Sequence, residues 1–97
     1  MAKYPFAPSP YGNFTSLDIT TATVVKASPG AVVMAQVIVA GSTAGAIYDA
    51  TSTSGNTTAN QVAVIPNTVG GIEVRFPCVN GIVVAPGTGQ TVALSYE

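Results

Sequence analysis

The stretch AVVMAQVIVA, residues 31–40, limits the possible folds more than any other part of the chain. Its valines and isoleucine branch at Cβ, which restricts χ1 and favours an extended backbone. Because side chains alternate along a strand, one side would carry Val33, Ala35, Val37 and Val39, and the other would carry Val32, Met34, Gln36, Ile38 and Ala40. A strand that is apolar on both sides is covered on both sides. We therefore expect a covered strand, part of whose cover comes from outside this short domain.

Charged residues are scarce in the chain. Its 97 residues make one domain with a single core, and 7% of them are charged, against roughly 25% in an average soluble domain. The cations Lys3, Lys26 and Arg75 are widely separated, so the basic cluster that nucleic acid or anionic lipid would need is missing. A free monomer with so few charges is poorly protected against association. We therefore expect a homo-oligomer, with a trimer as the expected state, inside a larger assembly.

Short strand signals separated by turns fill the chain after residue 17. They cover residues 19–26, 31–40, 46–51, 61–65, 72–76, 82–85 and 91–96. Asn80-Gly81 is a strong signal for a two-residue hairpin turn, and it predicts that 72–76 and 82–85 pair with each other. About seven strands at this spacing predict an all-β domain over residues 18–97, a single small β-sandwich or barrel with antiparallel strands.

Residues 1–17 differ from the rest and predict an extended N-terminal arm. Its prolines at positions 5, 8 and 10 disfavour a helix. A disordered tail is normally poor in aromatic residues, but this segment holds four of the seven in the chain. The arm is either a strap that docks on a partner or a segment that folds back over its own sandwich. The candidate interface residues are Tyr4, Pro5, Phe6, Pro8, Tyr11 and Phe14, together with Glu73 and Arg75.

The chain offers little catalytic chemistry. It has no histidine and one cysteine, so Cys78 has no imidazole base and is interpreted as a small core residue. The acids occur singly, without the spacing of a calcium or zinc site. We expect no enzyme activity, metal or cofactor. Asp49 is expected to bind loop amides, and Glu73 with Arg75 to form either an exposed edge pair or a polar contact with a neighbouring subunit.

The sequence contains no recognisable membrane or export signal. The N-terminal residues lack the apolar region of a signal peptide. The apolar run at 31–40 is shorter than the roughly 20 residues that a membrane helix needs. We expect synthesis in the cytoplasm and no membrane insertion.

Three segments carry a family resemblance: VVKASPGAVV, AGSTAGAIYD and IPNTVGGIEVRFPCVNGIVVAPGTGQTVALSYE. With these segments, residues 24–97 resemble small virion structural proteins of tailed phages, in particular capsid decoration (cement, head-stabilising) proteins. The resemblance implies a non-enzymatic, oligomeric β module on the capsid surface that bridges subunits of the major capsid protein. The alternative is a module of the tail or fibre that binds a host glycan or receptor.

Overall fold

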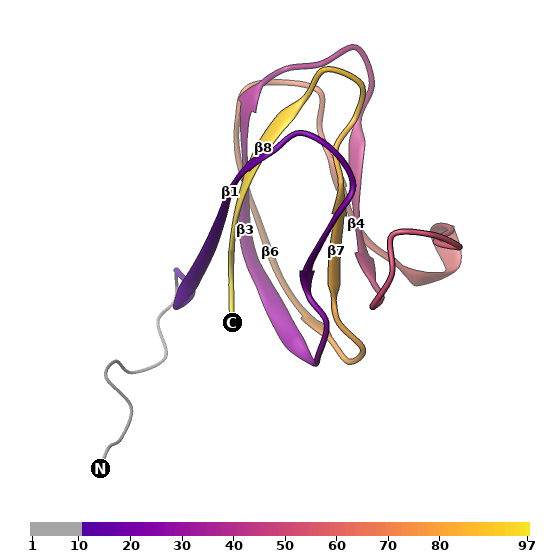
Figure 1. The fold of residues 1–97 in the computed structure, drawn as a ribbon. Coiled ribbons are helices and arrows are strands. Elements are labelled where there is room, and N and C mark those ends of the chain that lie inside the picture. Colours follow the sequence, from indigo (N-terminus) through magenta and orange to yellow (C-terminus); the bar gives the residue numbers. More distant parts are fainter. Residues whose placement is uncertain (1–10) are drawn as a thin grey trace.

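The computed structural model describes residues 11–97 and shows two four-stranded antiparallel sheets packed face to face (Figure 1). Sheet A has the strand order β1-β8-β3-β6, and sheet B has the order β2-β7-β4-β5. The strands are β1 (Phe14–Ile19), β2 (Thr23–Lys26), β3 (Gly30–Val39), β4 (Gly45–Asp49), β5 (Gln61–Ile65), β6 (Gly70–Cys78), β7 (Ile82–Ala85) and β8 (Thr91–Tyr96), with a 3₁₀ turn η1 (Thr58–Asn60) before β5. The predicted all-β sandwich is confirmed, with eight strands rather than about seven, because residues 14–19 form an additional strand, β1, that overlaps the range assigned to the arm.

Successive strands alternate between the two sheets, except that β4 and β5 pair directly. This order is that of a jelly roll. The predicted hairpin at Asn80-Gly81 is wrong, because β6 pairs with β3 and β7 pairs with β2 and β4. Neither residue of the turn has the positive φ that a type I′ turn requires. The turn instead carries the chain from one sheet to the other.

The core lies between the sheets and is built from aliphatic side chains. Its fully buried members include Ile47, Ile65, Ile82 and Val84, each with no exposed area. Each such side chain contributes about 1.5–3 kcal/mol relative to an exposed one. In Figure 1 the sheet A strands β3 and β8 and the sheet B strands β4 and β7 lie on opposite sides of this core.

The predicted division of β3 into two sides is correct from Met34 to Ile38 and wrong at Val32 and Val33. Its pairing with β6 and β8 shifts between Val32 and Met34, which marks a bulge. One extra residue in a strand exchanges the sides of the residues that follow. Val32, Ala35 and Val37 consequently belong to the core cluster together. The side chains of Val33, Met34, Gln36 and Ile38 lie outside that cluster.

Strand β1 begins at Phe14, inside the range that the sequence assigned to the arm, and pairs with β8 along its length. Tyr11 is the first described residue of the arm. Tyr4, Pro5, Phe6 and Pro8 lie outside the described residues. Among residues 11–97, no helix is long and apolar enough to cross a membrane.

Candidate functional site

The outer face of sheet A carries a shallow apolar groove. Strands β1, β8 and β3 form its floor, and its volume is about 270 Å³. Leu17 is 69% exposed beside it, and Ile38, further along β3, is 55% exposed. The lining residues are Tyr11, Thr15, Leu17, Met34, Gln36, Ala93, Leu94 and Ser95. We call this the sheet A groove.

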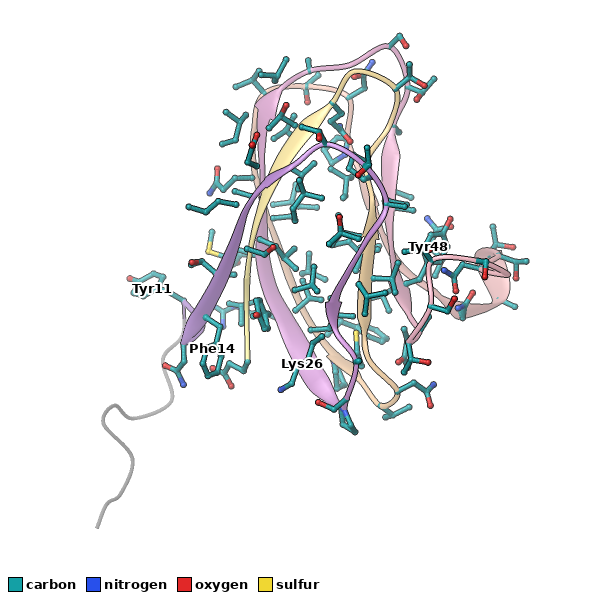
Figure 2. The ribbon with its side chains drawn as sticks, viewed as in Figure 1. Tyr11, Phe14, Lys26 and Tyr48 are labelled. Atoms are coloured by element: carbon teal, nitrogen blue, oxygen red, sulfur yellow. The ribbon has the colours of Figure 1, made fainter. Side chains whose placement is uncertain are left out.

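A glycine turn brings the chain onto this face. Gly12 has φ of 88°, and a Cβ there would lie 3.0 Å from the Tyr96 nitrogen and 3.2 Å from Cγ2 of Val33. Asn13 then donates its backbone N–H to the Tyr96 carbonyl at 3.2 Å. The position therefore requires glycine for its conformation and for its close approach to β8 and β3. Tyr11, the residue before this turn, forms one wall of the groove. It lies at the same end of sheet A as Phe14 (Figure 2).

One polar atom in the groove has no partner. The Ser95 hydroxyl oxygen is buried and makes no hydrogen bond within residues 11–97. A buried hydroxyl without a partner costs about 1–3 kcal/mol. An incoming segment with a carbonyl oxygen at this point would remove that cost.

The outer face of sheet B is also apolar. Val24, Val83 and Tyr48 are in register across β2, β7 and β4. Val83 is completely buried although it lies outside the core cluster, so neighbouring side chains on the outer face cover it. Val64 on the edge strand β5 is 58% exposed. Tyr48 lies on the side of the sandwich that carries the 50–60 loop (Figure 2).

Glu73 and Arg75 form an ion pair on the edge strand β6, with 2.9 Å between an Arg75 terminal nitrogen and Glu73 Oε2. The two side chains are 63% and 49% exposed, respectively. An exposed pair of this kind contributes roughly 0–1 kcal/mol. Arg75 also has a φ of 47° where the pairing of β3 with β6 shifts, so this edge is bulged and charged. Bulges and charges keep an edge strand from pairing with another chain.

The carboxylate of Asp49, at the end of β4, binds the β6–β7 turn. It accepts backbone N–H groups from Val79 at 3.1 Å, Asn80 at 2.8 Å and Gly81 at 3.2 Å. Partial burial raises the pKa of the carboxyl, but these hydrogen bonds outweigh it and hold the pKa below its ordinary value of 3.8. The prediction that Asp49 binds loop amides is confirmed. The role of the carboxylate is therefore structural: it holds the β6–β7 turn against the end of β4.

Gln90 has the corresponding position at the other end of the sandwich, and the sequence did not predict it. Its side chain is buried, accepts the Gly87 N–H at 3.0 Å and donates to the Pro66 carbonyl at 2.9 Å. Nearby, Thr88 donates its N–H to the Thr43 hydroxyl at 2.8 Å. The sequence around a glutamine after a Gly-rich turn does not indicate whether its side chain is buried and hydrogen-bonded or exposed to solvent.

Cys78 is buried in the core cluster at the end of β6, as expected of a small core residue. Burial, followed by the nearby negative charge of Asp49, raises the pKa of its thiol to about 11. The thiol is therefore protonated near neutral pH and does not act as a nucleophile.

Phe14 pairs with a ring of its own domain. Its ring centroid lies 5.7 Å from that of Tyr96, and both rings border a small hollow beside Lys26. Among residues 11–97, no group of three or more metal-ligating side chains could hold a metal ion.

No family model, curated protein or solved structure matches the chain. Within residues 11–97, the surface offers two apolar outer faces and one exposed ion pair, which is an arrangement suited to non-covalent contact.

Proposed function

We propose that this chain is a non-enzymatic structural protein of a phage virion, of the capsid decoration type, which stabilises the head by bridging subunits of the major capsid protein. The observation that supports the proposal is that both outer faces of the jelly roll are apolar. A monomeric protein normally covers its sheets with polar side chains on the solvent side. A module that is apolar on both sides is suited to lie between other protein surfaces, as a homo-oligomer on a capsid lattice.

Burial of apolar surface is the proposed mechanism. Each Å² of apolar surface removed from water contributes about 25 cal/mol, and specific interfaces bury roughly 1,200–2,000 Å² in total. Exposed Val24 and Val64, together with Tyr48, provide such surface on sheet B. Because the jelly roll occurs in viral capsid proteins and lectins alike, the fold alone does not choose the function.

The hydrogen bonds of the 50–60 loop argue against the glycan-binding alternative. Asn56 donates to the Ser52 carbonyl at 2.8 Å, and Asn60 donates to the Asn56 side chain at 2.8 Å. The Thr57 hydroxyl accepts the Ala59 N–H, and the Asn60 side-chain oxygen accepts the Thr57 backbone N–H. These polar groups are used to order the loop, so fewer of them are available to a sugar.

Separated phage particles test the proposal. Purified heads and tails are each sedimented with the full chain, and we expect it on heads. Val64→Glu places a charge on the sheet B face and should weaken head binding at least about tenfold, since a buried unpaired charge costs several kcal/mol. Val69→Glu is the matched control, because Val69 is also well exposed, at 69% against 58% for Val64, but lies in the β5–β6 connection. Binding to tails or to a glycan array, with none to heads, contradicts the proposal.

A further inference from the structure

We propose that Asn80-Gly81 is a site of spontaneous chemical modification, where water converts the Asn80 amide into a carboxylate, and that Asp49 restrains this reaction in the folded protein. The proposal goes beyond the proposed function and does not rest on it. Asn80-Gly81 is the one Asn-Gly pair in the chain. It lies in the β6–β7 turn, where the chain crosses from one sheet to the other.

The reaction joins two groups that are adjacent in the chain. The Gly81 nitrogen attacks Cγ of Asn80, so that the N–Cγ bond forms and the Cγ–Nδ2 bond breaks. The side-chain nitrogen leaves as ammonia and takes the proton of the Gly81 N–H. Water then opens the cyclic imide at either carbonyl and gives aspartate or isoaspartate at position 80. Glycine has no side chain that shields its nitrogen, so the attack is least hindered in an Asn-Gly pair.

The fold requires glycine at position 81, which keeps the reactive pair in place. A Cβ on Gly81 would lie 2.5 Å from the Ala50 carbonyl oxygen and 2.6 Å from the Lys26 carbonyl oxygen. Both atoms belong to the backbone, so neither can move aside as the end of a flexible side chain would. A larger residue therefore does not fit between the ends of β2 and β4, and no side chain at this position can shield the nitrogen.

Hydrogen bonds from the end of β4 hold the attacking nitrogen. Oδ1 of Asp49 accepts the Gly81 N–H at 3.2 Å and the Asn80 N–H at 2.8 Å. Ala50 donates its N–H to the Gly81 carbonyl at 3.2 Å, so the peptide groups on both sides of Gly81 are fixed. Ring closure needs the Gly81 N–H to leave Asp49, which requires local opening of the turn. Because the Asn80 side chain is exposed to water, these bonds and not burial restrain the reaction.

Modification reverses the interaction between Asn80 and Asp49. Against the burial that raises the Asp49 pKa, the hydrogen bonds that lower it include one from the Asn80 side-chain amide. The product replaces this donor by a second carboxylate, and two neighbouring carboxylates repel each other. The β6–β7 turn is therefore weakened by the change, and the loss is irreversible because ammonia diffuses away.

Mass spectrometry of the folded full-length chain, incubated at neutral pH, tests the restraint. Trypsin cleaves after Arg75, so Asn80 is the one asparagine in the peptide from Phe76 to Glu97. Asp49→Asn keeps the shape of the side chain but removes its charge, so its bonds to the turn are weaker. We expect the peptide to lose its amide about tenfold faster than in the unsubstituted protein. In urea the two proteins should react at the same rate, because the turn is open in both.

Gln90→Leu is the control for a general loss of stability. It removes hydrogen bonds at the other end of the sandwich and leaves the bonds of Asp49 in place. If the reaction proceeds through local opening of the β6–β7 turn, Asn80 in this variant reacts at the rate of the unsubstituted protein. A rate that rises as much as in Asp49→Asn would show that global unfolding controls the reaction, which contradicts the proposal.

Asn80→Asp reproduces the aspartate product and tests its effect on the turn. It should lower Tm by about 4–8 °C at neutral pH. Asp49→Asn in the same chain removes one of the two carboxylates, so the double variant should be no less stable than Asp49→Asn alone. Asn67→Asp is the matched control and should keep Tm unchanged, because Asn67 is also exposed but lies in the β5–β6 connection.

Two further results would overturn the inference. Equal reaction rates in the folded unsubstituted protein and in folded Asp49→Asn mean that Asp49 does not restrain Asn80. Equal Tm values for Asn80→Asp and Asn67→Asp mean that a carboxylate at position 80 does not act on Asp49. Neither measurement uses a phage particle, so these failures are distinct from failure of the head-binding test.

Discussion

Each end of the sandwich is closed by a polar side chain of its own, and these two side chains differ in charge and burial. At the Gln90 end, a neutral and buried amide joins the β7–β8 turn to the β5–β6 connection. At the Asp49 end, a partly buried carboxylate joins β4 to the β6–β7 turn. In Figure 1 the loops of the Gln90 end lie at the top and the β6–β7 turn lies at the bottom.

This difference shows which end depends on conditions. The hydrogen bonds of a neutral amide are the same at every ordinary pH, whereas those of a carboxylate weaken when it is protonated. The Gln90 end should therefore be permanently closed, and the Asp49 end should loosen in acid. The two ends can be separated by experiments on stability.

The largest effect is expected from Gln90→Leu. Leucine has nearly the same size but leaves the Gly87 N–H and the Pro66 carbonyl without their side-chain partners. Leaving such groups unpaired costs about 2–4 kcal/mol, which for a domain of this size lowers Tm by roughly 10–20 °C. Thermal melting followed by circular dichroism measures the loss, which should be equal at neutral and acidic pH.

Gln61→Leu is the matched control for this change. Gln61 makes one side-chain bond, to the Ala63 carbonyl at 3.3 Å, and is only partly buried. The same substitution there should cost less than about 0.5 kcal/mol. Equal losses at the two glutamines would show that the buried bonds of Gln90 do not close that end.

The sequence predicted the strands well because strand formation depends on local side chains. The β-branched run at 31–40 became β3, and the alternating segment 72–76 lies within β6. Pairing was not predictable, because it depends on contacts between distant residues. Asn80-Gly81 has a hairpin signal, but Asp49, about thirty positions earlier, binds the turn amides and helps to hold it as a crossover between sheets.

The candidate site was predictable only in part. The scarcity of charge and the apolar character of β3 on both sides anticipated an apolar outer face. The bulge after Val32, which decides the residues on that face, leaves no clear sequence signal. The groove also depends on Gly12 and Ser95. The sequence does not single out either residue, because their roles depend on the path of the chain around Tyr96.

Asp49→Asn is expected to have an intermediate effect that depends on pH. The three N–H bonds lower the pKa of the folded carboxyl below 3.8, so their stabilisation is present above that value and is lost as pH falls through the lowered pKa. Near neutral pH the variant should lose about 1–2 kcal/mol. Urea unfolding at a series of pH values should show this difference shrinking in acid.

Asp18→Asn supplies the control for the Asp49 experiment. Asp18 is exposed at a φ of 56°, a conformation that asparagine also adopts readily. Its replacement removes one carboxylate without touching the β6–β7 turn. If both variants lost stability with the same pH profile, the general charge of the protein and not the Asp49 hydrogen bonds would be responsible.

The smallest effect is expected at Cys78, which senses the charge of the Asp49 end. Burial, and then the negative charge of Asp49, raise the pKa of this thiol to about 11. Asp49→Asn removes the charge and keeps the burial, so the thiol pKa should fall by less than about one unit. Thiolate absorbance during an alkaline titration measures it, and Cys78→Ala supplies the tyrosine background. Because the thiol only packs in the core, Cys78→Ala should itself cost about 1 kcal/mol and leave oligomer formation intact. A thiol pKa that is unchanged by Asp49→Asn would mean that burial alone sets it and that the charge of this end does not reach the core.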